Sequence, residues 1–108
     1  MKMKTTAEIL TEMADTFRAR NAIYSDNYKN VGAVLIAMFP NGVQLKTQED
    51  FTRWHLFELL IVKLTRFANS GLTHKDSIHD GTVYGAMVES LIQEGTDPIT
   101  TVERKQNE

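Results

Sequence analysis

The sequence predicts an all-α fold, namely a four-helix bundle with short connections. Apolar residues recur at helical spacing in four separate segments, and capping or turn residues bound each segment. No segment shows the convincing alternation of apolar and polar residues that a half-buried strand requires. We expect residues 1–95 to form a single helical domain and residues 96–108 to form a polar C-terminal tail.

Length and composition fit one small globular domain. The chain has 108 residues, of which 42% are hydrophobic and 24% are charged, and this balance argues against disorder. A net charge of -2 gives no global attraction to nucleic acid, and there is no basic helix suited to a DNA groove. The apolar runs are too short for a membrane span, and acidic residues interrupt the start before a signal sequence could form. These features, and the absence of cysteine, predict a cytoplasmic protein without membrane association or disulfides.

The first two helices are expected over residues 7–22 and 27–39. Thr5 or Thr6 can cap the first helix, and Ser25 or Asp26 can cap the second. One apolar stripe runs along the first helix and consists of Ile9, Leu10, Met13, Ala14 and Phe17. The apolar residues of the second helix are Val31, Val34, Leu35 and Met38, and the turn sequence Pro40-Asn41-Gly42 follows it.

The third helix is predicted to be the central one. Thr47 and Asp50 form a capping signature at its start, and Gly71 supplies a left-handed stop after residue 69. Apolar residues cover more than half of its circumference, so it should pack on several sides. The remainder, which we call the polar strip, consists of His55, Glu58, Val62, Arg66 and Asn69, with Lys63 at its edge.

The fourth helix should begin at a cap on Thr73 or Asp76, continue to about residue 93 and end at Gly95. Its apolar row is Val83, Met87 and Leu91. A second row contains Gly81 and Gly85, which allow another helix to approach closely. Short extended pieces are possible at residues 43–46 and between Ile99 and Val102.

Asp76 and Asp80 are the first candidates for chemistry. They lie four residues apart, so they share one face of the fourth helix, which Val83 and Met87 continue toward the bundle. Two carboxylates that lie close together in a partly buried place repel each other unless a cation lies between them. Mg²⁺ could be that cation, because it prefers oxygen ligands, and Glu58 could supply a third oxygen. Alternatively, Asp76 caps the helix and Asp80 pairs with a lysine or arginine.

Lys63 and Arg66 are candidates for holding a phosphate or for pairing with carboxylates across the helix hairpin. His55 lies one turn before Glu58 and could act as an acid or base, although a packed histidine is an alternative. Aromatic and amide groups in the first interhelical connection could contact a nucleobase or anchor the connection; they belong to Tyr24, Asp26, Tyr28 and Asn30.

Three blocks of residues carry a family resemblance. They are Tyr24-Ser25-Asp26-x-x-x-Asn30, Leu60-x-x-Lys63-Leu64-x-Arg66-x-Ala68-Asn69 and His74-x-Asp76-Ser77-x-x-Asp80-x-x-x-Tyr84-Gly85. This pattern resembles small helical proteins of unknown function that occur mostly in bacteriophages and prophages. More distantly, it is similar to nucleotide-modification-associated helical domains and to the MazG-like all-α nucleoside triphosphate pyrophosphohydrolases.

The resemblance implies a MazG-like helical core and a role in nucleotide metabolism, in the host cytoplasm if a phage encodes the chain. Glu58, Asp76 and Asp80 would hold Mg²⁺, with Glu58 and Asp80 as catalytic candidates. The nucleotide would contact Tyr24, Asn30, His55, Lys63, Arg66 and Asn69. The pyrophosphohydrolases have two glutamates three apart on the first helix of the site, whereas this chain offers only Glu58 there.

Three functions therefore stay open at this point. The first is binding, with possible hydrolysis, of a nucleoside phosphate. The second is a non-catalytic binding protein that sequesters a nucleotide signal or docks on a host enzyme. The third is a helical dimerisation unit, because a chain with Gly81 and Gly85 on one face and an apolar third helix is expected to form a homo-oligomer.

Overall fold

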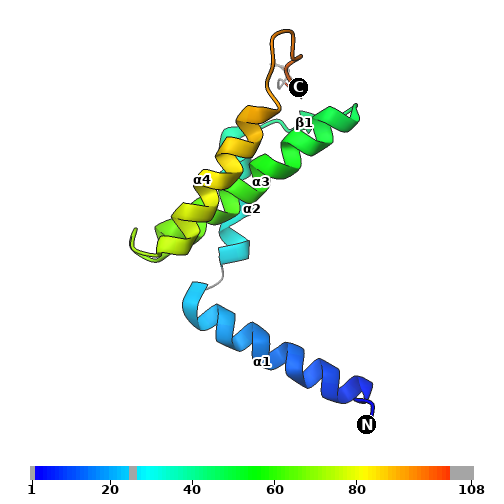
Figure 1. Cartoon of the computed structure of the whole chain (residues 1–108), viewed down its shortest axis with the longest axis vertical. Helices are drawn as coiled ribbons and strands as arrows, with labels where there is room; N and C mark the ends of the chain where they lie inside the picture. The colour runs from blue at the N-terminus through cyan, green and yellow to red at the C-terminus, as the bar shows by residue number, and fades with distance from the viewer. Residues whose placement is uncertain (1, 25–26, 103–108) are drawn as a thin grey trace, which may run out of the picture.

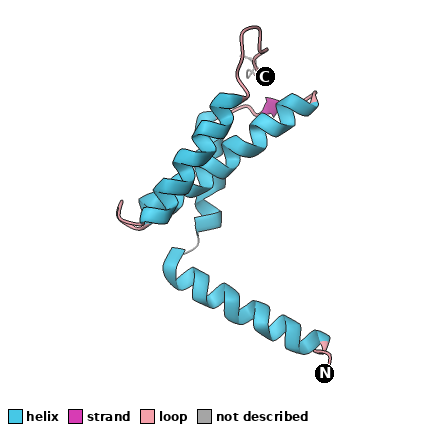
Figure 2. Ribbon diagram, in the orientation of Figure 1, coloured by secondary structure: helices cyan, strands magenta, loops and turns pink. Residues whose placement is uncertain are grey.

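The computed structural model describes residues 2–24 and 27–102, apart from the side chains of residues 23 and 24. Its helices are α1 (Thr6–Tyr24), α2 (Asn27–Met38), α3 (Gln48–Asn69) and α4 (Lys75–Ser90), and its two short strands are β1 (Val43–Gln44) and β2 (Thr100–Thr101). The all-α prediction is confirmed (Figures 1 and 2). None of the described helices combines the length and the hydropathy that crossing a membrane requires.

Helix α3 is the centre of the packing, as predicted. It packs along α4 on one side and against α2 on another (Figure 1). Against α2, the ring of Phe39 meets Trp54 and Phe57 edge-on, with centroids 5.3 and 5.9 Å apart. Ile61 (4% exposed) is the one fully buried hydrophobic side chain in the described part of the chain. The core is therefore small and lies along α3.

Helix α1 lies apart from the other three helices. It leads away from them, so that the N-terminus is at the far end of the molecule (Figure 1). Thr5 caps it, because the N–H of Glu8 donates to the Thr5 hydroxyl over 3.2 Å. The predicted apolar stripe is present but largely exposed, with Ile9 40%, Leu10 59% and Met13 60% exposed. The stripe thus does not join the core of its own chain.

The predicted start and end of α3 are confirmed. At the start, the N–H of Asp50 donates to the Thr47 hydroxyl (3.1 Å), and the Asp50 carboxylate accepts from the N–H groups of Thr47 (3.3 Å) and Lys46 (3.0 Å). The bond from Lys46 and the bonds with Thr47 hold the pKa of the Asp50 carboxyl below its usual value. At the end, Gly71 has a φ of 71°, and Leu72 follows with a φ of 64°.

Helix α4 differs from its prediction at both ends. Its N-cap is His74 and not Thr73 or Asp76, because the Thr73 hydroxyl donates to the Ser70 carbonyl (2.8 Å) and Asp76 lies inside the first turn. The helix ends at Ser90 and not near residue 93, since the next N–H groups, beginning with Leu91, bond carbonyls three residues back. The cap proposed for α2 at Ser25 or Asp26 lies outside the described residues.

The segment after α4 is tied back to the body. Strand β2 pairs with β1 in antiparallel register, with Thr101 opposite Val43. Arg53 of α3 donates to the Asp97 carbonyl over 2.8 Å. The first part of the predicted C-terminal tail is therefore held, as far as residue 102, by hydrogen bonds to β1, Gly42 and Arg53. The short extended pieces expected at residues 43–46 and between Ile99 and Val102 form this ladder.

The capping box leads to a prediction about stability. Thr47→Ala should lower the free energy of unfolding by about 1 kcal/mol, because it leaves the N–H of Asp50 without its partner. Thr52→Ala is the matched control, since Thr52 is an exposed threonine inside the same helix. The contribution of the Asp50 carboxylate to the free energy of unfolding should be complete above about pH 3.9, the ordinary aspartate pKa. It should be lost as the pH falls through the lowered pKa of Asp50. Equal losses for Thr47→Ala and Thr52→Ala in urea unfolding would contradict the prediction.

Gly81 gives a second stability prediction. It is buried where α4 meets α3, and a Cβ there would lie 3.5 Å from Lys63 Cβ and 3.7 Å from Leu60 Cδ1, which is ordinary contact. Gly81→Ala should therefore stabilise the protein by about 0.5–1 kcal/mol through helix propensity. Gly81→Leu should overpack the seam and cost about 1–3 kcal/mol. Gly32→Ala and Gly32→Leu, in open space on α2, should both be tolerated in the same thermal unfolding series.

Candidate functional site

The polar strip of α3 winds around the helix instead of facing one neighbour. Lys63, Arg66 and Asn69 follow one another at three-residue steps, and each step turns back by about 60° around the helix axis. Lys63 consequently faces α4, whereas Asn69 faces α2 and Arg66 lies between them. The structure thus divides the predicted site into two parts.

On the α4 side, Lys63 pairs with Asp80. The Lys63 Nζ lies 3.2 Å from Asp80 Oδ2, and the two side chains are 20% and 46% exposed. This contact confirms the expected juxtaposition of α3 and α4 side chains across the hairpin. It corresponds to the alternative in which Asp80 is neutralised by a lysine.

On the α2 side, Asn69 anchors the first residue of α2. Its side-chain Nδ2 donates to the Oδ1 of Asn27 over 2.8 Å, and Asn27 is 4% exposed. A buried amide needs such a partner, because an unsatisfied polar group would cost on the order of 1–3 kcal/mol. Asn69 was predicted to touch a ligand; in the structure its described contact is to Asn27, which lines a pocket.

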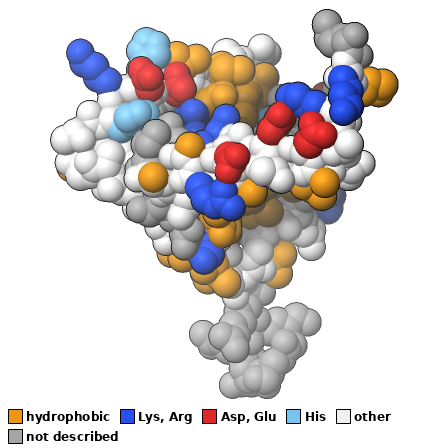
Figure 3. All heavy atoms as spheres, turned by 90° about the horizontal axis from the view of Figure 1, so that it is seen from below, with side chains coloured by type: hydrophobic (Ala, Val, Ile, Leu, Met, Phe, Trp, Pro, Cys, Tyr) orange, Lys and Arg blue, Asp and Glu red, His pale blue; other side chains and the backbone are white. Residues whose placement is uncertain are grey.

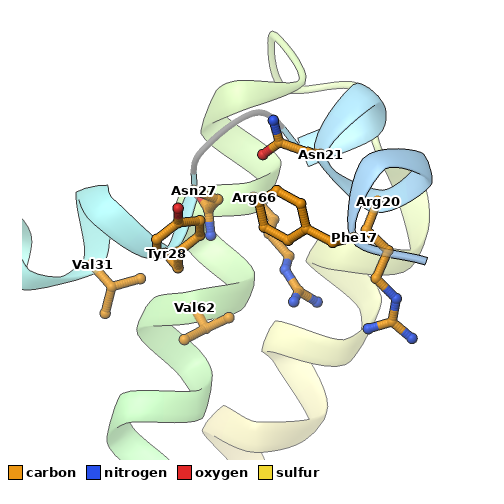
Figure 4. A pocket seen from close by; sticks show the side chains of 8 residues that line it. All are labelled: Phe17, Arg20, Asn21, Asn27, Tyr28, Val31, Val62 and Arg66. Atoms are coloured by element: carbon orange, nitrogen blue, oxygen red, sulfur yellow. The ribbon is translucent and has the colours of Figure 1, made fainter. Parts of the chain in front are cut away.

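That pocket, which we call the α1–α3 pocket, is the hollow that Val62 and Arg66 of the strip border. It has a volume of about 360 Å³ and lies where the end of α1, the start of α2 and the last turns of α3 meet. The residues around it are Phe17, Arg20, Asn21, Asn27, Tyr28, Val31, Val62 and Arg66 (Figure 4). Ligand pockets usually have volumes of roughly 300–1,000 Å³, so this hollow falls within the range for a small molecule.

The pocket joins an aromatic wall to two cations. The rings of Phe17 and Tyr28 meet edge-on, with centroids 6.4 Å apart and an interplanar angle of 60°. Arg66 reaches the pocket from α3 and Arg20 from α1 (Figure 4). A flat guanidinium suits phosphate or carboxylate groups, and an aromatic face suits a flat ring. None of the described residues around the pocket is acidic.

The three carboxylates predicted to bind Mg²⁺ are not gathered. Glu58 is five residues before Lys63, which turns it by about 140° around α3, away from the pair with Asp80. Asp76 is exposed and lies with His79 at a shallow depression on α4. In the described part of the chain, no three histidine, aspartate or glutamate side chains converge to hold a metal. A three-carboxylate ligand set is therefore not formed within one copy.

The remaining candidates lie elsewhere. His55 and Asn30 are exposed, and neither borders a described pocket. Tyr28 and Asn30 belong to α2 and not to a loop, because the connection after α1 contains only two residues. The side chain of Tyr24 and the whole of Asp26 lie outside the described residues.

Sequence reasoning missed the part of the pocket that α1 contributes. Phe17 was assigned to an apolar stripe, and Arg20 and Asn21 were not considered. Their signal is visible in retrospect, because Arg20 and Asn21 stand three and four residues after Phe17 and so continue the stripe with polar groups. A change from apolar to polar residues along one helix face marks the place where that face reaches a pocket or solvent.

Comparison with known proteins adds no relative. No family model matches the chain, and neither the curated proteins nor the solved structures contain a significant match.

The Lys63–Asp80 pair leads to a quantitative prediction. A double-mutant cycle with Lys63→Met and Asp80→Asn should give a coupling of about 0.2–1 kcal/mol, because both groups keep contact with water. The coupling should shrink in high salt, since screening weakens exposed pairs. A cycle on the 2.6 Å surface pair Asp15–Arg18 of α1 provides the comparison. A Lys63–Asp80 coupling near zero in low salt would contradict the pairing.

Proposed function

We propose that this protein binds a phosphorylated small molecule with a flat ring, of which a nucleotide is the natural example, in the α1–α3 pocket. The observation that carries the proposal is the presence of Arg20 and Arg66 beside an aromatic wall in one hollow of about 360 Å³. The ring of such a ligand would lie against Phe17 or Tyr28, and its phosphate would accept hydrogen bonds from the arginines.

The two kinds of contact select the ligand class together. An apolar hollow alone would accept many hydrophobic molecules, and arginines alone would accept any anion. Inorganic phosphate lacks the ring and a nucleoside lacks the charge, so each should bind more weakly than a nucleotide. Asn21 adds a side-chain amide at the same pocket, which can donate to and accept from a base or sugar.

The proposal covers binding and leaves out hydrolysis. The carboxylates that the MazG-like resemblance assigned to a metal do not border the pocket, and Asp80 already pairs with Lys63. Mg²⁺ would enter as the counter-ion of the ligand's own phosphates, in the way it commonly accompanies nucleotides. We therefore favour the binding-protein alternative over a pyrophosphohydrolase.

Arg66→Ala and Arg20→Ala test the proposal. Loss of one charge-assisted contact should weaken nucleotide binding by about tenfold or more, corresponding to roughly 1.5–3 kcal/mol. Arg18→Ala is the matched control, because Arg18 is an exposed arginine of α1 that pairs with Asp15 and does not border the pocket. Calorimetric titration with nucleoside mono-, di- and triphosphates, with and without MgCl₂, measures the effect, and nucleosides and inorganic phosphate serve as the partial ligands.

Circular dichroism separates a binding defect from a folding defect, since Arg66 is half-buried and also contacts other residues. Arg20 is exposed, so Arg20→Ala should fold normally and still lose affinity. Unchanged nucleotide affinity in both variants, or the absence of binding by any nucleotide to the unmodified protein, would refute the proposal. Release of product during the titration would restore the hydrolytic reading.

A further inference from the structure

A single copy of this chain is far from compact. Its accessible surface is 8669 Å², whereas a compact monomer of 12.3 kDa exposes about 6,100 Å². Its radius of gyration is 18.3 Å, whereas about 13 Å is typical of a globular domain of this length. The excess surface is about 2,600 Å², and a stable dimer needs only about 800 Å² from each partner. One copy therefore leaves more surface uncovered than an interface requires.

Two exposed apolar rows account for part of this surface. On α1 the row is Ile9, Met13 and Phe17, which are 40%, 60% and 52% exposed. On α4 the row is Val83 and Met87, continued by Leu91 at its C-cap, and these side chains are 47%, 41% and 38% exposed. Figure 3 shows hydrophobic side chains gathered at the surface next to acidic and histidine side chains.

The α4 row borders the seam with α3. Asp80, three residues before Val83, lies on the same side of α4 and reaches across the seam to Lys63. Gly81, one residue further, is buried against Leu60 and Lys63 of α3. The row thus lines the face of the α3–α4 pair on which the fourth helix of a bundle would rest, and α1 does not occupy that face.

We propose that α1 is exchanged between two copies of the chain. Helix α1 of each copy docks on the α3–α4 face of the other, and the two reciprocal contacts are related by a two-fold axis. Each copy then has a complete four-helix bundle in which the fourth helix comes from its partner. The occupant of the apolar face is a second copy of this chain because the chain itself supplies both halves of the contact.

Charge sets the direction of docking. The apolar rows of α1 and α4 both repeat at four-residue steps, so they match along their whole length in either direction. Antiparallel packing is the arrangement that neighbouring helices of an up-and-down bundle adopt. It also brings the end of α1 that carries Arg18 toward the start of α4, where Asp76 is exposed, so that opposite charges approach each other.

Exchange fits this chain better than folding back. Only two residues connect α1 with α2, which is the short end of the range of about 2–8 residues that joins helices folded back on each other in bundles. In an exchanged dimer α1 keeps the outward direction that it has in Figure 1 and buries Ile9 and Met13 of its apolar row, while Phe17 borders the α1–α3 pocket. Short connections between packed elements are known to favour such exchange.

The first experiment measures mass in solution. The unmodified protein should sediment as a dimer across a concentration series, and Met13→Asp or Met87→Asp should weaken dimerisation at least about tenfold, because either places a charge in the apolar contact. Thr11→Asp is the matched control, since it adds the same charge to the opposite side of α1. A monomer at all concentrations, or equal effects of Met13→Asp and Thr11→Asp, would overturn the proposal.

The second experiment identifies the contact. Because the chain has no cysteine, one copy with Met13→Cys can be mixed with a differently tagged copy with Met87→Cys and oxidised. A disulfide between the two tags is expected, and Thr11→Cys in place of Met13→Cys should give none. A chain that carries both Met13→Cys and Met87→Cys tests the closed monomer. If its disulfide forms only within one chain, exchange is overturned. A dimer in which residue 13 is linked only to residue 13 would overturn exchange as well. Met13 does not border the α1–α3 pocket, so these outcomes do not depend on ligand binding.

Discussion

The structure depends on the double use of α3 as the packing surface for both α2 and α4. One side of this helix carries Trp54 and Phe57 against Phe39 at the end of α2, and another meets Gly81 of α4 at close range. Because successive residues turn by about 100°, Lys63 and Asn69 come to lie at the contacts with α4 and α2, whereas His55 stays exposed. This is why Lys63 has Asp80, and Asn69 has Asn27.

The elements that the sequence predicted well are those decided by local chemistry. The capping box of Thr47 and Asp50 and the left-handed residue Gly71 need only their near neighbours, so their signals survive in any fold. The start of α4 was mispredicted because Thr73 has two possible local partners, and its hydroxyl bonds backward to Ser70. The exposure of α1 could not be read from its stripe, since helical spacing of apolar residues shows that a face will be buried but not by which chain.

The candidate site was predictable only in part for a related reason. The pairing of α3 with α4 follows from a short hairpin, and it brought Lys63 to Asp80 as expected. The three-residue step to Arg66 moves that guanidinium to the other seam, so two residues that look like one site in the sequence serve two different neighbours. Phe17 and Arg20 enter the pocket only through the direction that α1 takes, which is a long-range property of the chain. Glu58 was expected beside Asp80, but the same rotation carries it away.

The small core gives the two proposals a common physical basis. Ordering a residue costs on the order of 1–2 kcal/mol of backbone entropy, and Ile61 is the one buried hydrophobic side chain among the described residues. A partner that covers α1 and the α3–α4 face would add apolar burial to this small core. A ligand between Phe17 of α1 and Arg66 of α3 also fixes the direction of α1 relative to the body. If both proposals hold, thermodynamic linkage makes the two equilibria reciprocal. The factor by which the ligand changes the affinity of dimerisation must equal the factor by which dimerisation changes the affinity for the ligand. Both equilibria depend on the position of α1.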